Sequence, residues 1–148
     1  MSFATTQDAY KELVTVYLSP ALRDMGFRGS GGKYQLPSES HWSLIELQKS
    51  AFGDRSDMTF TLNLFVVPRD SWMQTGKRVS IQGLRPESGT YRDGFERARL
   101  GMLAGSDDRD HWWSLQPDTD LAALSRTVLT DLERVGMPWM IARMTAFQ

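Results

Sequence analysis

The sequence predicts an α+β fold, in which helices from both ends of the chain pack on one face of an antiparallel meander sheet. Three observations lead to this fold class. Apolar residues recur every three or four positions near both termini, and they alternate with polar residues in the middle of the chain. The 148 residues, of which 41% are hydrophobic, suit one core. We therefore expect a single globular domain over residues 1–148.

The first predicted element is an amphipathic helix over Thr6–Met25. Ser19–Pro20 predicts either a kink or the start of a second short helix, because proline fits the first helical turn better than the interior. Gly26 suits the left-handed position that often follows a helix. A turn over Gly29–Gly32 and a short strand over Lys33–Pro37 come next. The apolar face of the helix consists of Tyr10, Leu13, Val14, Tyr17, Leu18, Leu22 and Met25.

Two long strands joined by a hairpin loop form the centre of the predicted sheet. Trp42–Ser50 and Met58–Val67 flank a loop over Phe52–Asp57 that is rich in glycine, aspartate and serine. Apolar and polar residues alternate along the second strand, so one of its faces is buried. The register that matches the two apolar faces places Leu47 opposite Leu62 and Ile45 opposite Leu64.

The second half of the chain begins with long connections. Pro68–Gly94 is rich in glycine, proline and serine, and only Val79–Leu84 has the pattern of a brief strand. Alternation resumes at Phe95 and predicts a further strand, with Ala98, Leu100 and Met102 on one face and Arg97 and Arg99 on the other.

An acidic turn over Gly105–Asp110 and an extended segment around Trp112 and Trp113 precede the C-terminal helices. Asp118 or Thr119 is predicted to cap a helix that Gly136 ends. A last short helix is expected within Pro138–Phe147. The face of the capped helix consists of Leu121, Leu124, Val128, Leu132 and Val135.

The polar side of the predicted sheet is the best candidate for a functional site. If the three central strands are neighbours, it carries Glu46, Gln48, Thr61, Asn63, Arg97 and Arg99. Arginine and amide groups held on strands can bind a carboxylate, a phosphate or a peptide backbone. The alternative is a solvated face on which Glu46 and Arg99 form a cross-strand ion pair.

Trp112 and Trp113 point in opposite directions if their segment is extended, so we expect one in the core and the other at the surface. A surface tryptophan beside the polar face would extend the binding site, although tryptophans also simply fill cores. The candidate binding residues are therefore Glu46, Gln48, Asn63, Arg97, Arg99, Trp112 and Trp113.

Composition restricts the chemistry. The absence of cysteine excludes disulfides and thiol nucleophiles, and His41 and His111 are the only histidines. Asp107, Asp108, Asp110 and His111 form the densest cluster of potential metal ligands, but a turn with a solvated acidic tip explains them better, and we predict neither a metal nor a cofactor. The net charge of -1 and the lack of a reader motif make nucleic acid an unfavourable partner. No apolar stretch is long enough for a membrane span, so we expect a cytoplasmic protein.

Four sequence motifs occur in order after the opening helix that ends in Gly26–Phe27: W-S-L-I-E-L-Q-K-S, F-T-L-N-L, R-A-R-L-G-M-L and D-H-W-W-S-L. Together they resemble the domain-of-unknown-function 4304 family over roughly Ala9–Pro138. This resemblance implies a domain, but it implies no reaction. The family pattern falls on Gln48, Lys49, Ser50, Asn63, Arg97, Arg99, Gly101, Trp112 and Trp113.

We expect a non-catalytic binding or interaction module that uses the polar sheet face. Its ligand would be a protein, for example a toxin-like partner in a bacterial immunity system, or a small anion. The alternative is an enzyme acting on a small phosphate- or carboxylate-bearing compound, with Arg97 and Arg99 clamping the anion and Glu46 acting as acid or base. A purely structural module is the third hypothesis.

Overall fold

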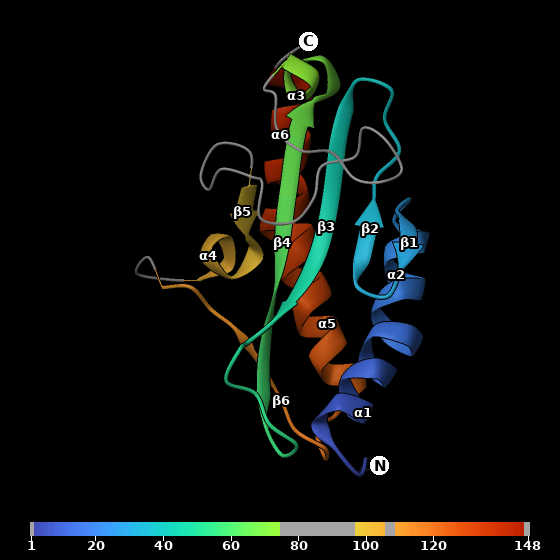
Figure 1. Cartoon of the computed structure of the whole chain (residues 1–148), viewed down its shortest axis with the longest axis vertical. Helices are drawn as coiled ribbons and strands as arrows, with labels where there is room; N and C mark the ends of the chain where they lie inside the picture. The colour runs from blue at the N-terminus through green and yellow to red at the C-terminus, as the bar shows by residue number, and fades with distance from the viewer. Residues whose placement is uncertain (1, 75–96, 106–108, 147–148) are drawn as a thin grey trace.

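The protein is built around two long antiparallel strands backed by helices (Figure 1). The structure is a computed structural model that describes residues 2–74, 97–105 and 109–146. The strands are β1 (Arg28–Ser30), β2 (Lys33–Gln35), β3 (His41–Lys49), β4 (Met58–Pro68), β5 (Arg97–Arg99) and β6 (Trp113–Leu115). The helices are α1 (Thr6–Glu12), η1 (Leu13–Leu18), α2 (Ser19–Asp24), α3 (Arg69–Gln74), α4 (Leu100–Ala104), α5 (Leu121–Asp131), η2 (Leu132–Gly136) and α6 (Met137–Ala146), where η marks a π-helical turn.

The strand order confirms the predicted meander. β1 to β5 follow one another across an antiparallel sheet, and β6 pairs with β4. Leu47 lies opposite Leu62 and Ile45 opposite Leu64, so the predicted register of the central hairpin is confirmed. The predicted α+β fold class is confirmed as well, because helices from both ends of the chain lie behind the sheet (Figure 1).

The N-terminal helix continues from α1 through η1 into α2. Pro20 lies at the start of α2, one of the two predicted alternatives, directly after the π-helical turn in which the Ser19 N–H donates to the Val14 carbonyl. Gly26 follows the helix with a φ of +104°. The Phe27 N–H donates to the Leu22 carbonyl at 3.0 Å and the Gly26 N–H to the Arg23 carbonyl at 3.0 Å, which is the Schellman arrangement of helix ends.

The glycine-rich turn after this helix is part of a tighter hairpin than predicted. Gly31 and Gly32 have φ of +65° and +89°, and they join β1 to β2 as a two-residue turn. Such turns need positive φ at both central positions. The segment that includes Gly29 is therefore a strand, β1, where the sequence had predicted only a turn.

The C-terminal helices differ from the prediction at both ends. Asp120, and neither Asp118 nor Thr119, caps α5, because its carboxylate accepts from the Ala123 N–H at 3.0 Å. Gly136 does not end the helix. The chain continues through η2 into α6, and a side chain at Gly136 would meet the Leu132 Cδ1 at 2.7 Å. Gly136 therefore serves close packing rather than termination.

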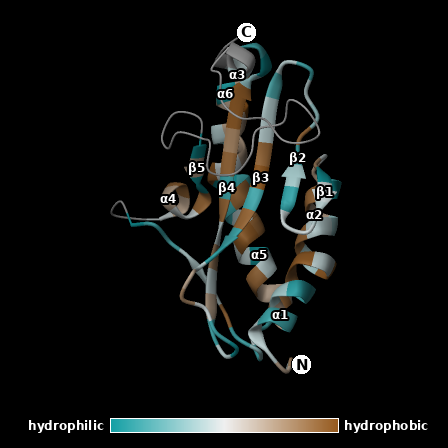
Figure 2. Cartoon of the chain, in the orientation of Figure 1, coloured by the Kyte–Doolittle hydropathy of each residue, from teal (hydrophilic) through white to brown (hydrophobic). Residues whose placement is uncertain are grey.

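Two apolar clusters hold the sheet in place. The larger one lies between the sheet and the N- and C-terminal helices and includes Ile45, Phe60, Leu64, Val128 and Leu132. Figure 2 shows hydrophobic residues along β3, β4 and the helices behind them. The smaller cluster lies on the opposite face, toward one end of the central hairpin, and consists of Trp42, Leu44, Phe65, Val67 and Trp72.

The smaller cluster corrects the prediction that Pro68–Gly94 contains only surface connections and a brief strand. The helix α3 follows β4 directly, and its Trp72 is 1% exposed and packs edge-on against Phe65. The predicted strand over Val79–Leu84 lies outside the described residues.

Along one edge, β4 pairs with two separate short strands, β5 and β6. Arg99 of β5 stands opposite Asn63, and Trp113 of β6 stands opposite Phe60. An unbroken strand would reach Phe60 with residue 102, so eleven extra residues are inserted between the two pieces. We call Leu100–Trp112 the edge excursion. It begins with α4, which corrects the predicted strand alternation through Leu100 and Met102.

Candidate functional site

A straight row of polar residues crosses the outer face of the sheet, the face opposite the larger core. Successive strand pairings place Lys33 opposite Glu46, Glu46 opposite Asn63, and Asn63 opposite Arg99. Each of four neighbouring strands therefore contributes one side chain to what we call the outer row. Directly opposite residues in an antiparallel sheet have Cβ atoms about 5 Å apart, so these side chains are neighbours.

Asn63 is fixed at the centre of the outer row. It is 6% exposed, and its side-chain N–H donates to the Gln48 Oε1 at 2.9 Å. Thus Gln48 and Asn63 do share one face, as the register predicts. The Asn63 Oδ1 is buried and accepts no hydrogen bond from the residues that the structure describes. Asn63 therefore serves to position Gln48 rather than to contact a ligand itself.

Arg99 is oriented by the end of the edge excursion. Its Nη1 donates to the Asp110 Oδ2 at 3.0 Å, and the Trp112 Nε1 donates to the same oxygen at 3.0 Å. The guanidinium carbon lies 5.6 Å from the centre of the Trp112 ring. Asp110 thereby connects the outer row to the excursion, and its negative charge offsets the charge of Arg99.

The excursion can return this closely because of Gly101. A side chain there would lie 1.9 Å from the His111 carbonyl oxygen and 2.8 Å from the Asp110 Oδ1. The Gly101 carbonyl also accepts from the His111 N–H at 3.1 Å. The lack of a side chain at this position therefore lets Asp110 reach Arg99.

The prediction of a solvated polar face is wrong for the centre of the sheet. Glu46 is 7% exposed, Asn63 6% and Thr61 0%. Gln48, Arg97 and Arg99 are half-buried, so they are the accessible members of the predicted site. Arg97 lies opposite Phe65 and so borders the smaller apolar cluster. Arg99, for which an ion pair with Glu46 was the alternative, pairs with Asp110 instead.

The two tryptophans divide as predicted. Trp113 is 2% exposed and packs in the larger core near Phe60, with ring centres 6.2 Å apart. Trp112 is half-buried beside Arg99. Among the candidate residues, Trp113 therefore belongs to the core, while Trp112 lies next to the outer row.

A hollow of about 470 Å³ lies beside Asp110 and Trp112. We call it the excursion pocket. It is lined by Ala104, Gly105, Arg109, Asp110, His111, Trp112 and the α5 residue Asp131.

With this geometry in view, the chain can be compared with known proteins. A family model described as a domain of unknown function, DUF4304, matches residues 18–142. The chain belongs to this family. The DUF4304 match covers all six strands, so the outer row and the edge excursion lie wholly within it. Neither the curated proteins nor the solved structures include a significant match to the chain.

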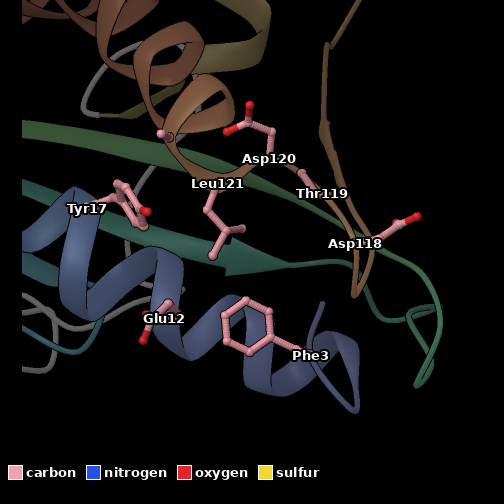
Figure 3. Close-up of a pocket in the computed structure, with 8 residues that line it drawn as sticks. Phe3, Glu12, Tyr17, Asp118, Thr119, Asp120 and Leu121 are labelled. Atoms are coloured by element: carbon pink, nitrogen blue, oxygen red, sulfur yellow. The ribbon is translucent and has the colours of Figure 1, made fainter. Parts of the chain in front are cut away.

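Another pocket, with a volume of about 410 Å³, lies between the N-terminal helix and the start of α5 (Figure 3). Phe3, Tyr17 and Leu121 provide its apolar walls. The carboxylates of Glu12, Asp118 and Asp120 point away from one another and do not converge (Figure 3).

Metal chemistry has little support in the described parts of the domain. No group of three potential ligands lies close enough to hold an ion within residues 2–74, 97–105 and 109–146. Asp107 and Asp108, two members of the acidic cluster in the sequence, lie outside the described residues. None of the helices in these same ranges has the length and apolar character that a bilayer span requires.

Two members of the site do not follow from the pattern of a single strand. Lys33 joins the outer row through the pairing of β2 with β3, which the short first hairpin determines. The sequence suggests Asp110 only as a potential metal ligand in the acidic turn. Its pairing with Arg99 follows from the path of the edge excursion, which returns Asp110 to the end of β5. The R-A-R and D-H-W-W motifs contain both partners, but their spacing in sequence gives no sign of the contact.

Proposed function

We propose that this domain is a non-catalytic binding module whose outer face recognises a protein ligand through Gln48 and Arg99, with Trp112 at the margin and the buried Asn63 orienting Gln48. The observation that carries the proposal is the pairing of Arg99 with Asp110. A paired guanidinium presents its remaining N–H donors without a free positive charge. Beside it, the side-chain N–H of Asn63 donates to the Gln48 Oε1 at 2.9 Å and thereby orients the Gln48 amide.

Neutral donors and acceptors on a rigid sheet suit amide and hydroxyl groups of another protein. Trp112 adds the kind of amphipathic aromatic surface that often anchors such interfaces. The charge pattern also supports a protein ligand, since Lys33, Glu46, Arg99 and Asp110 give both signs across a short distance. We propose a cytoplasmic location and a bacterial origin on the sequence argument alone.

The alternative, an enzyme that clamps a phosphate or carboxylate between Arg97 and Arg99, has less support. Asp110 already offsets the charge of Arg99, which lowers the attraction for an anion. Glu46, the acid or base of that mechanism, is 7% exposed and therefore poorly accessible to a substrate.

The test is a quantitative capture experiment with three variants. Tagged parent protein is used to isolate ligands from a native lysate, and each captured protein is then purified and titrated. We expect Arg99→Ala and Gln48→Ala to weaken binding of the captured protein at least about fivefold. The control Arg126→Ala, an exposed arginine on α5, should bind like the parent.

Melting temperatures are measured for the same variants, because a loss of binding counts only for folded protein. If Arg99→Ala and Gln48→Ala remain folded and bind every captured protein as the parent does, the proposal is wrong. A thermal-shift screen with anionic metabolites tests the enzyme alternative, which predicts stabilisation that Arg97→Ala and Arg99→Ala abolish.

A further inference from the structure

The pocket between the N-terminal helix and the start of α5, which we call the helix pocket, has an apolar middle (Figure 3). Leu121 of α5 extends toward the N-terminal helix between Tyr17 of η1 and Phe3 (Figure 3). Leu121 is buried, and the two aromatic side chains are half-buried against the larger core. Aromatic rings in such positions pack well against methylene groups and attract cations through their faces.

The walls of the helix pocket are held by hydrogen bonds within the protein. The Phe3 N–H donates to the Pro117 carbonyl at 2.8 Å, which ties Phe3 to the loop that precedes α5. Within that loop, the Thr119 Oγ1 accepts from the Gln116 N–H at 2.8 Å. Both sides of the pocket are therefore ordered before a ligand arrives, which lowers the entropic cost of binding. The volume of about 410 Å³ lies within the usual range for small-molecule sites.

The charged side chains that line the helix pocket are all acidic, namely Glu12, Asp118 and Asp120. Asp120 is engaged as the cap of α5, where its carboxylate accepts from the Ala123 N–H at 3.0 Å and offsets the positive end of the helix dipole. The carboxylates of Glu12 and Asp118 make no hydrogen bond or ion pair with any residue that the structure describes. Two carboxylates are therefore available to a positively charged ligand.

Positive charges near the helix pocket do not reverse this balance. Lys11 precedes Glu12 in the chain and Arg126 follows on α5, but both are exposed and neither lines the pocket. Asp8, one turn before Glu12 on α1, adds a further acid on that side. The amino group of Met1, a residue outside the described part of the chain, adds at most one positive charge. The acids in and beside the pocket still outnumber these cations, so the pocket attracts positive charge.

The positions of the carboxylates distinguish between kinds of cation. Around the apolar middle of the pocket they point away from one another (Figure 3). A calcium or magnesium ion needs several oxygen ligands that converge on one point, and this arrangement does not offer them. A chain of methylene groups that carries separated ammonium groups fits instead, because its middle packs on the apolar walls while its charged ends reach carboxylates on different sides.

We propose that the helix pocket binds a linear polyamine, a flexible chain in which ammonium groups are separated by methylene groups. Glu12 and Asp118 contact the ammonium groups, and Phe3 and Tyr17 contact the methylene chain. This inference does not rest on the proposed function, because the pocket lies among the helices behind the sheet and shares no residue with the outer face (Figure 1). A protein on the outer face and a polyamine in this pocket can bind independently.

Spermidine is a suitable probe, and its binding is followed by the backbone amide signals of Leu121 and Ala122 in two-dimensional NMR spectra. The titration is made at low ionic strength, because salt screens such contacts. We expect a saturable shift of both signals at millimolar concentrations. Magnesium ion carries charge without a methylene chain, and n-butylamine carries the chain with a single charge. Each should bind at least about fivefold more weakly than spermidine.

The variants Glu12→Gln and Asp118→Asn keep the size of the side chain and remove its charge. Each should weaken spermidine binding about threefold or more, and Phe3→Ala should weaken it by removing an aromatic wall. The control Glu133→Gln, at an exposed acid on η2, should bind as the parent does. Asp120 is left unchanged because it caps α5. Melting temperatures show that each variant is folded.

Three outcomes would overturn the proposal of a polyamine site. Spermidine could cause no saturable shift of the two amide signals, or the folded variants Glu12→Gln and Asp118→Asn could both bind it as the parent does. Magnesium ion could also shift the same signals as strongly as spermidine, which would mean that the acidic side chains attract any cation. None of the variants changes Gln48 or Arg99, so these outcomes are distinguishable from a failure of the proposed function.

Discussion

His41 is an ionisable residue placed where its charged form is disfavoured. It begins β3, is 2% exposed, and its Nδ1 lies 2.7 Å from the Ser40 Oγ. The Nε2 is buried and has no hydrogen-bond partner among the described residues. Burial therefore lowers the pKa of His41 below its ordinary value of 6.5.

This lowered pKa predicts a loss of stability in mild acid. Below about pH 6.5 the unfolded chain binds a proton that the folded chain does not, so the free energy of unfolding falls as the pH drops toward the folded pKa. The slope stays below about 1.4 kcal/mol per pH unit, which is the limit for the uptake of one proton. Urea denaturation between pH 5 and pH 8 measures it.

The variant His41→Gln provides the control for this pH dependence, because it cannot titrate. Its stability should change less between pH 8 and pH 5 than that of the parent. An equal change in both proteins would assign the acid sensitivity to other groups.

Among the secondary-structure elements, the continuous C-terminal helix shows how packing overrides a local signal. Gly136 followed by Pro138 is a typical stop signal, and the sequence predicts that the helix ends there. In the structure the Met137 N–H instead donates to the Leu132 carbonyl across the wide turn of η2. Pro138 follows this wide turn directly, so the π-helical turn lies where the proline interrupts the regular hydrogen bonds of the helix. Gly136 is needed because Leu64 and Leu100 pack against it.

We predict that Gly136→Ala destabilises the protein by about 1–3 kcal/mol. Alanine alone would favour the helix by about 1 kcal/mol, but its Cβ would lie 2.7 Å from the Leu132 Cδ1 and 3.0 Å from the Leu100 Cδ1. Both leucines are fully buried and have little room to move. Thermal and urea denaturation measure the change.

The matched control is Ala142→Gly on α6, which removes a methyl group from an exposed helical position. It should cost about 1 kcal/mol through helix propensity alone. A Gly136→Ala protein more stable than the parent would mean that the core adapts to the added methyl group.

At the scale of the whole molecule, the sequence predicts most of the central sheet but little of its surroundings. The alternation in β4 and the matching residues in β3 determine their register, because a shift by one residue would bury Glu46 and Asn63 among the helices. Alternation does not predict the apolar cluster on the polar face, since that cluster includes Trp72 of α3. The sequence does not show where β5 ends either, because three alternating residues fit both a strand and the start of a helix.

The free edge of the sheet, beside β1, is covered by an arginine. Arg23 of α2 donates through Nε and Nη2 to the Gly29 carbonyl oxygen at 3.2 and 3.0 Å. Gly29 lies at a position of β1 whose backbone groups point away from β2. Exposed edge groups of this kind can pair with another chain, and a charged side chain prevents this.

Arg23→Ala should therefore promote self-association through the β1 edge. Light scattering coupled to size-exclusion chromatography should give a higher average mass than for the parent at the same concentration. Two controls separate loss of the hydrogen bonds from loss of charge. Arg23→Lys keeps the positive charge, and Arg28→Ala removes a positive charge from β1 while Arg23 stays in place. If the mass of Arg23→Ala equals that of the parent at every concentration, Arg23 does not protect the β1 edge from pairing with another chain.

The break in the edge strand of β4 has a consequence for how the domain can vary. Because Arg99 and Trp113 each pair with β4 on their own, the register of the sheet is independent of what lies between them. The length of the edge excursion between Gly101 and Asp110 can therefore change while the register stays the same, whereas Leu100 is held by the core and Gly101 by the close return of the backbone. Chains with this fold can thus differ at one edge of the sheet without rebuilding their core.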